Sequence, residues 1–408
     1  MLLLKLLSYS HLAQAGLCPF GGINFVLEEL ESLGIGSMLE SELPGLCRTS
    51  RYGWKDIIYS FWSLTLFGSG CIEDIGGNFR SFLSGTPWMQ VPSPDRILGR
   101  FKEISSPVEQ LKSPRGTKEQ GFSFHRTLCD LNLAILSRLG KLPKRGGILD
   151  YDNTILFNKK ADSRYTYKKA SGYFPGAAFI NGQVVFIENR NGNSDAQTLQ
   201  AHTLKQMFDR LESHGIRAGA FRADSASYQM DVVDMVDKQA DRFYIRARMG
   251  QPLAEATGRI DNWKELGDGQ MRGDTLFVPF RNAASRNKRG KREKAFRLVV
   301  TKGPRDDGQI NLFTGEACCY SAILTNDHDM DNDRVVHFYN QRGASEKEFD
   351  ILKNDFNWNR LPFSRPEQNT VLLYLSAMCR NLYGYIIGKS SAKFKCLNPS
   401  DRLKKFIY

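Results

Sequence analysis

The chain has 408 residues, of which 41% are hydrophobic and 25% are charged. This composition can form a buried core in two or more domains, and it excludes a chain that is disordered throughout. The formal net charge of +12 favours a polyanionic partner. The eight cysteines include no C-x2-C pair, so we expect neither a zinc site nor a secreted disulfide framework and predict a cytoplasmic protein. The N-terminal apolar run MLLLKLL is too short for a signal peptide or a membrane span.

The first third of the chain has the apolar spacing of helices. From about residue 20 to residue 104 the apolar residues recur at intervals of three and four, which predicts several helices. Residues 105 to 121 are polar and are predicted to be a linker, and a further helix is predicted from 124 to 139. We therefore treat residues 1–145 as one helical region.

From residue 147 the pattern changes to that of strands. Residues 147–156, 172–180 and 183–188 are predicted to be three consecutive strands, and Asn181-Gly182 is a strong hairpin signal between the last two. A capping box from Ser194 to Gln197 predicts a helix through about Leu211. A short strand then ends at Asp224, and residues 243–248 form another strand. Residues 146–248 are thus the first part of an α/β domain.

A β-rich insertion is predicted over residues 249–335, because strand-like runs begin near 275, 296 and 319. Residues 336–408 complete the α/β domain and include one long C-terminal helix. Two basic stretches, 158–169 and 281–297, are candidate DNA contacts, although either can be a solvated loop. Their candidate residues are Lys159, Lys160, Arg164, Lys168, Lys169, Lys288, Arg289, Lys291 and Arg292.

Three acids lie on or directly after predicted strands. Because side chains alternate along a strand, Asp150 and Asp152 point to the same side of the first one. Two carboxylates within an apolar strand require a cation, which is either a metal ion or a salt-bridge partner. Asp224 ends another strand, where open α/β sheets place ligand groups, but an aspartate there can also cap the next helix.

A later segment groups Tyr339, Arg342, Glu346 and Lys353 within about 60° of one helix face. Such a face suits a metal-bound phosphodiester, since the acid holds a divalent cation while the other side chains contact phosphate oxygens. A solvated charged helix is the alternative. A second capping box, from Ser345 to Glu348, would begin the helix at about Glu346 and leave Tyr339 and Arg342 outside it.

Asp152, Asp224 and Glu346 are sufficient to hold two metal ions, which can activate a water or a 3′-hydroxyl and stabilise the leaving oxygen of a phosphodiester. Asp150 is a possible further ligand. We place Asp152 closer to the metal, because it lies nearer the end of the strand at which Asp224 should emerge if the two strands pair in parallel. Asp150 would then support the site indirectly, by holding Arg342 or Lys353.

These residues carry a family resemblance. The order β-β-β-α-β-α-β resembles the ribonuclease H-like mixed sheet of the retroviral-integrase superfamily, here with a β-rich insertion and a helical N-terminal region. The Y-x2-R-x3-E-x6-K spacing from Tyr339 to Lys353 resembles the YREK signature of bacterial insertion-sequence transposases of the DDE type. The D-x-T context of Asp152 and the strand that ends at Asp224 are similar to the same family.

The resemblance implies cut-and-paste transposition: two-metal hydrolysis at the ends of the element, followed by attack of the 3′-hydroxyl on target DNA. It further implies two Mg²⁺ ions, for which Mn²⁺ substitutes, and a homodimer bound to terminal inverted repeats that the N-terminal region recognises. A metal-dependent nuclease without strand transfer and a non-catalytic DNA-binding descendant remain alternatives. Glycosidase carboxylates fit less well, because the neighbouring cations suit phosphates.

Overall fold

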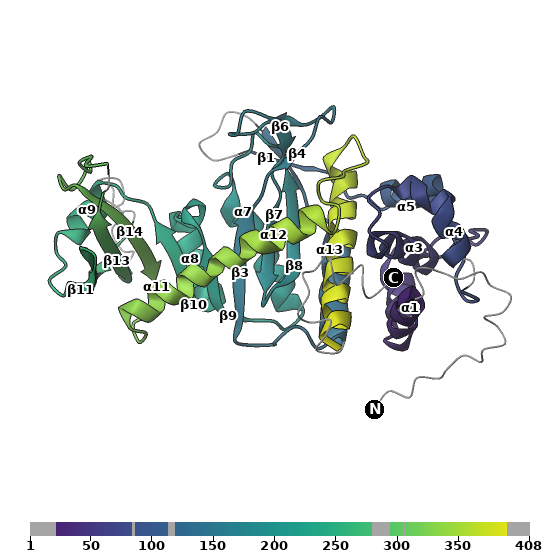
Figure 1. Ribbon diagram of the computed structural model, residues 1–408, viewed down its shortest axis with the longest axis horizontal. Helices are drawn as coiled ribbons and strands as arrows, with labels where there is room; N and C mark the ends of the chain where they lie inside the picture. Colours follow the sequence, from purple (N-terminus) through teal and green to yellow (C-terminus); the bar gives the residue numbers. More distant parts are fainter. Residues whose placement is uncertain (1–21, 84–85, 113–118, 280–293, 306, 390–408) are drawn as a thin grey trace.

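The computed structural model describes residues 22–83, 86–112, 119–279, 294–305 and 307–389. The N-terminal helices lie at one end of the molecule and the insertion strands at the other, with the central sheet between them (Figure 1). None of the described helices combines the length and the apolar character needed to cross a bilayer.

The N-terminal region is helical, as predicted. Its elements are α1 (Gly22–Ser32), α2 (Ile35–Glu42), α3 (Trp54–Leu66), η1 (Ile72–Gly76), α4 (Asn78–Leu83) and α5 (Pro94–Glu103). Helix α5 begins with Ser93 as its N-cap and Pro94 in its first turn, which is a typical helix start. The buried indole of Trp62 in α3 donates a hydrogen bond of 2.8 Å to the carbonyl of Leu375, so this region is packed onto the C-terminal helix.

The predicted linker is wrong in part, because it contains an edge hairpin. Strands β1 (Glu109–Lys112) and β2 (Glu119–Ser123) pair antiparallel, and β2 continues onto β8 (Gln183–Arg190). The described residues of β1 are mostly exposed and polar. The pairing is held by main-chain hydrogen bonds, which do not depend on the side chains. Its sequence therefore does not need the alternating apolar pattern by which strands are predicted.

The central sheet has the predicted ribonuclease H-like arrangement. Its strands are β3 (Gly147–Asn153), β7 (Gly176–Ile180), β8, β9 (Ala218–Ala223) and β10 (Ala240–Ala247), in the order β8-β7-β3-β9-β10. Strands β3, β7 and β8 are antiparallel neighbours, whereas β9 pairs in parallel with both β3 and β10. Asn181 and Gly182 join β7 to β8 with φ values of 50° and 78°, which confirms the predicted hairpin turn.

The insertion is β-rich, as predicted, and it extends the same sheet. It contains α9 (Gln251–Thr257), β11 (Lys264–Gly267), β12 (Gln270–Phe277), β13 (Phe296–Pro304) and β14 (Cys318–Thr325). Strand β14 pairs antiparallel with β10, so the sheet has eleven strands within the described residues. The exact boundaries at residues 145, 248 and 335 stay predictions.

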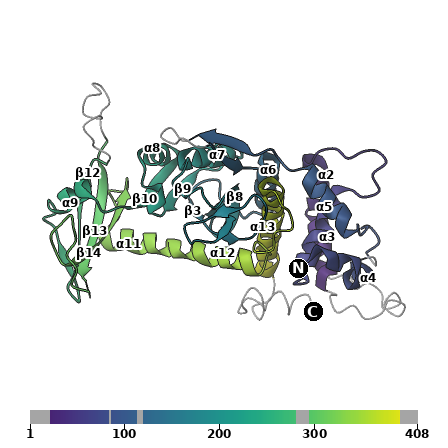
Figure 2. The same cartoon turned by 90° about the horizontal axis from the view of Figure 1, so that it is seen from above.

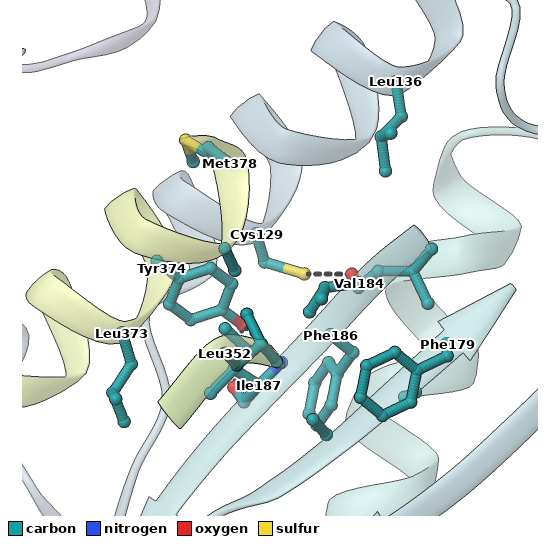
Figure 3. Close-up of a cluster of buried hydrophobic side chains, with 14 of the residues drawn as sticks. Cys129, Leu136, Phe179, Val184, Phe186, Ile187, Leu352, Leu373, Tyr374 and Met378 are labelled. Carbon is teal, nitrogen blue, oxygen red and sulfur yellow. Dashed lines mark hydrogen bonds between the residues drawn. The ribbon is translucent and has the colours of Figure 1, made fainter. Parts of the chain in front are cut away.

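Helices cover both faces of the central sheet. Helices α7 (Gln200–Ser213) and α8 (Met230–Gln239) lie on one face, and α11 (Asn332–Asn340), η3 (Gln341–Gly343) and α12 (Ala344–Asn354) lie on the other (Figure 2). Helices α6 (Arg126–Arg138) and α13 (Pro366–Lys389) pack against β8. Their shared core includes Cys129, Tyr374 and Phe186 (Figure 3), and the hydroxyl of Tyr374 donates a hydrogen bond of 2.7 Å to the carbonyl of Ile187.

Helix α7 begins five residues later than the capping box predicts, because its N-cap position is Leu199 instead of Ser194. Leu199 has a φ of 52°, a left-handed conformation that interrupts a helix. The carboxylate of Asp195 accepts hydrogen bonds from the backbone of Gln197 and Thr198 and so stabilises a separate turn. Residues 194–199 therefore form a loop between β8 and α7.

Candidate active site

The strand register places Asp152 and Asp224 side by side. Strand β3 pairs in parallel with β9, with Asp150 opposite Arg222 and Tyr151 opposite Ala223. One residue further along each strand are Asp152 and Asp224, at the edge where parallel strands present ligand groups. Strands β3 and β9 therefore pair in parallel, which was the condition for choosing Asp152 over Asp150 as the acid closer to the metal.

Both acids open into a pocket of about 480 Å³ that also contains the third predicted acid. The pocket lies between the ends of these strands, helix α12 and the loop that precedes α7. Its lining residues are Asp152, Asn153, Thr154, Tyr167, Phe174, Asp195, Ala196, Gln197, Asp224, Arg342, Glu346, Phe349, Asp350 and Lys353. Five segments of the chain thus build one site: residues 152–154, the segment from Tyr167 to Phe174, residues 195–197, Asp224, and residues 342–353.

Arg342 pairs directly with Asp152. Its Nη1 atom lies 2.8 Å from Oδ2 of Asp152, and both side chains are largely buried. Burial raises the pKa of Asp152, the charge of Arg342 opposes this, and the charge of Asp224 raises the pKa further. Burial alone would lower the pKa of Arg342, but the carboxylate of Asp152 keeps it above its ordinary value. The guanidinium therefore supplies a counter-charge to the buried acid.

Asp150 has a different partner from the ones predicted for it. It receives two hydrogen bonds of 2.7 Å from Nε and Nη2 of Arg222, which is the cross-strand neighbour of Asp150. The same guanidinium donates to the carbonyl of Phe338 and lies 4.8 Å from the centroid of its ring. Burial raises the pKa of Asp150, and Arg222 opposes the increase. Asp150 thus links β3, β9 and α11 and does not line the pocket.

Asp224 caps a short 3₁₀ turn, η2 (Ser225–Ser227), as its alternative interpretation predicted. Its Oδ1 accepts a hydrogen bond of 2.9 Å from the backbone of Ala226. Gln229 then ties this turn to the loop that precedes α7, since its amide donates to the carbonyls of Ala226 and Gln197. Capping uses one carboxylate oxygen of Asp224 and does not remove the residue from the pocket.

Glu346 reaches the pocket from a nearly continuous helical run. Helix α11 is followed directly by η3 and α12 (Figure 1). Residues Asn340, Gly343 and Ala344 all have right-handed helical angles. The capping box expected at Ser345 does not form, because the hydroxyl of Ser345 donates to the carbonyl of Arg342 inside this run. Glu346, which is exposed, and Arg342 therefore project from one run into one pocket.

Tyr339 and Lys353, the two ends of the predicted signature, differ in their surroundings. Tyr339 is 5% exposed and does not line the pocket; it packs in a cluster with Tyr244 and Ile323, and burial raises its pKa. Lys353 does line the pocket, and its partial burial lowers its pKa. Tyr339 is placed to support Arg342, whose guanidinium carbon lies 6.0 Å from the centroid of the tyrosine ring.

Carboxylate oxygens are the ligands that Mg²⁺ prefers, so the chemistry of Asp152, Asp224 and Glu346 fits this ion. Within the described ranges, however, no three His, Cys, Asp or Glu side chains lie close enough together to form a metal-binding group. The pocket therefore contains the ligand types that a metal requires, while the nearest cation to Asp152 is Arg342.

Sequence reasoning missed the loop that carries Asp195 into the pocket. The loop is held by a fully buried ion pair of Glu188 and Arg190, both 0% exposed. Arg190 donates through Nη1 to the carbonyls of Asp195 and Thr198 at 3.1 and 2.8 Å. The available signal was the pair of charges inside the apolar run QVVFIENR, since buried charges require partners.

The predicted basic contacts fall into two groups. The first group lies on or beside the small sheet of β4 (Leu156–Phe157), β6 (Ser171–Tyr173) and β5 (Arg164–Tyr165), next to the pocket. Within the described chain, none of its cations has a carboxylate partner; they are Lys159, Lys160, Arg164, Lys168 and Lys169. Lys288, Arg289, Lys291 and Arg292 lie outside the described residues.

Comparisons with known proteins give a family match and one similar solved structure. The family model described as "Transposase DDE domain group 1" matches residues 133–395, well over half of the chain. No curated protein sequence matches the chain. Among solved structures, the chain is similar to a piggyBac transposase in a synaptic complex with hairpin DNA, determined by cryo-EM, with a TM-score of 0.46 and 10% identity. That alignment covers 94% of this chain and 79% of the other.

Proposed function

This chain belongs to the DDE transposase family whose domain model it matches, and on that premise we propose that it catalyses cut-and-paste DNA transposition. The reaction would hydrolyse phosphodiesters at the ends of an element and then transfer the freed 3′-hydroxyl to target DNA. We further propose that it belongs to the bacterial insertion-sequence group with the YREK signature. A homodimer that binds terminal inverted repeats would carry out the reaction.

The observation that supports the proposal is the in-register placement of Asp152 and Asp224 beside Glu346 in one pocket. These three residues would hold two Mg²⁺ ions, or Mn²⁺ in their place. When bound, such ions activate a water or a 3′-hydroxyl and stabilise the leaving oxygen.

The other residues of the pocket act on charge and position. Arg342 keeps the buried carboxylate of Asp152 paired while the pocket is free of substrate, and it can transfer its hydrogen bonds to a phosphate oxygen. Lys353 faces the same space and attracts the phosphodiester. The loop from Asp195 to Gln197, held by Arg190, closes the wall opposite α12. These side chains would orient one phosphodiester against the acids.

The first test uses Asp224→Ala and Glu346→Ala with a plasmid that carries the DNA flanking this gene. We expect both variants to lose Mg²⁺-dependent cleavage and to keep DNA binding, because the acids bind metal while the cations bind phosphate. Cleavage is measured on gels and binding by fluorescence anisotropy. Cleavage close to the wild-type rate by either purified variant would overturn the assignment.

The main alternative is a metal-dependent nuclease that uses the same acids without strand transfer. An assay for products in which the cut end is joined to a second plasmid separates the two functions. Joined products support transposition, whereas cut ends that never join support the nuclease.

A further inference from the structure

One aromatic side chain lies at the mouth of the acid pocket and is not used in the proposed chemistry. Tyr167 lines the pocket together with the acids, yet 67% of it is exposed. The ring of Phe174 meets it edge to face, with the centroids 6.0 Å apart. Most of the Tyr167 ring surface is therefore free to contact a ligand that enters the pocket.

The turn that carries Tyr167 is held firmly. The buried hydroxyl of Thr166 donates to the carbonyl of Ala170 at 2.9 Å and accepts from the backbone of Lys168 at 3.2 Å. The main chain closes the same turn with a hydrogen bond from Lys169 to Thr166, and Lys169 has a φ of 59°. Tyr167 therefore sits on a rigid turn, and ordering it on binding costs little conformational entropy.

The hairpin of β5 and β6, which carries Tyr167, is also fixed to the central sheet. The backbone N–H of Phe174 donates to the carbonyl of Arg190 at 2.8 Å, and the N–H of Gly192 donates to the carbonyl of Gly172 at 3.0 Å. A Cβ atom at Gly192 would lie 2.6 Å from the carbonyl oxygen of Arg164, so only glycine permits this close approach. The position of Tyr167 relative to the acids is therefore set by the fold.

One lysine lies over the ring and a second follows it in the chain. The ammonium of Lys168 lies 5.4 Å from the centroid of the Tyr167 ring, and both Lys168 and Lys169 are exposed. An exposed aromatic ring next to lysines is the combination that binds single-stranded nucleic acid, because bases stack on the ring while cations neutralise the backbone. Inside a duplex the faces of each base are covered by its neighbours, so the ring can stack only on a base that has left the helix.

We propose that Tyr167 stacks on an unpaired base of the DNA strand whose phosphodiester enters the acid pocket, and that Lys168 and Lys169 hold the adjacent phosphates. This inference rests on the proposed function, since it assumes that the pocket cuts DNA. It adds the form of the substrate: a strand end that is separated from its complement.

The test measures binding in EDTA, so that no cleavage occurs. Duplexes of one sequence are compared with and without a short single-stranded 3′ overhang that carries 2-aminopurine, whose fluorescence falls when it stacks. The wild-type protein should prefer the overhang and quench the probe. Tyr167→Leu should lose roughly tenfold in that preference, together with the quenching. Tyr167→Phe should keep both.

Tyr165→Leu is the matched control. Tyr165 lies on the same hairpin and is 71% exposed, but it does not line the pocket. The inference is wrong if wild-type protein binds both duplexes equally, if Tyr167→Leu keeps the preference, or if Tyr165→Leu loses as much. We expect Tyr167→Leu and Tyr165→Leu to keep the wild-type melting temperature; a lower value would show that the substitution disturbs the fold. Because binding needs no metal, failure here is distinct from failure of the proposed chemistry, which the Asp224→Ala cleavage assay reports.

Discussion

Asp150 and Asp152 lie two residues apart on one side of β3, but their partners give them different roles. Asp150 is held by two hydrogen bonds from Arg222, in a pair whose side chains are 13% and 6% exposed. Asp152 has a single close hydrogen bond from Arg342 and faces the pocket beside Asp224. An arginine that holds one oxygen can be displaced more readily than one that holds two. We therefore expect Asp152 to be the acid that changes partners during the proposed reaction.

We predict that Asp152→Asn abolishes cleavage whereas Asp150→Asn only slows it, and that both variants lose stability, since each removes one partner of a largely buried pair with arginine. Removing one partner of a buried ion pair typically costs about 3–5 kcal/mol, because the other charge is left unpaired. Urea unfolding gives the stability, and cleavage is followed across a Mn²⁺ titration. An inactive Asp150 variant beside an active Asp152 variant would reverse the two roles.

At the scale of elements, the buried N-cap of α6 should make folding sensitive to pH. Nδ1 of His125 accepts from the backbone of Leu128, so Nε2 carries the proton and donates to the carbonyl of Ile104 at 2.6 Å. Burial lowers the pKa of His125 below 6.5. The unfolded chain consequently binds more protons once the pH falls below 6.5, and stability is lost over that range.

His125→Asn tests this, because asparagine keeps an acceptor for the Leu128 amide but does not titrate in this range. We expect the variant to be slightly less stable than wild type at pH 7.5 and to lose less melting temperature between pH 7.5 and pH 5. All other titrating groups are common to both proteins, so the difference between the two profiles isolates His125. Parallel profiles would contradict the prediction.

Elements were predictable from the sequence where the signal is local. The Asn181-Gly182 turn, the strand before Asp224 and the insertion strands follow from turn chemistry and apolar runs. The β1–β2 hairpin was not predictable, because its strands form by pairing with β8, which is distant in the sequence. The same limit applies to the site: the sequence indicates the acids, but the pairs Arg342–Asp152 and Arg222–Asp150 depend on register and on a helical run more than a hundred residues away.

At the scale of the whole molecule, one sheet connects the acid pocket to the insertion. Strand β10 pairs with β9 on one side and with β14 on the other, so the insertion strands are a direct extension of the catalytic strands. The helical N-terminal region is joined to the opposite side through α13. DNA held at either end would therefore be positioned relative to the acids by continuous secondary structure.

The net charge of +12 and the many cations between residues 281 and 297 favour a role for this stretch in binding phosphates. Changing Lys288, Arg289, Lys291 and Arg292 together to glutamine should weaken DNA binding and flatten its salt dependence. Each lost phosphate contact lowers the slope of log K against log salt by roughly 0.9. Lys144→Gln with Arg145→Gln is the control, because these exposed residues precede β3, at the end of that strand opposite Asp152. Anisotropy titrations at several salt concentrations give the slopes.

If the fourfold variant keeps the wild-type slope, this stretch does not contact DNA. If the control loses as much of the slope, the effect comes from net charge alone.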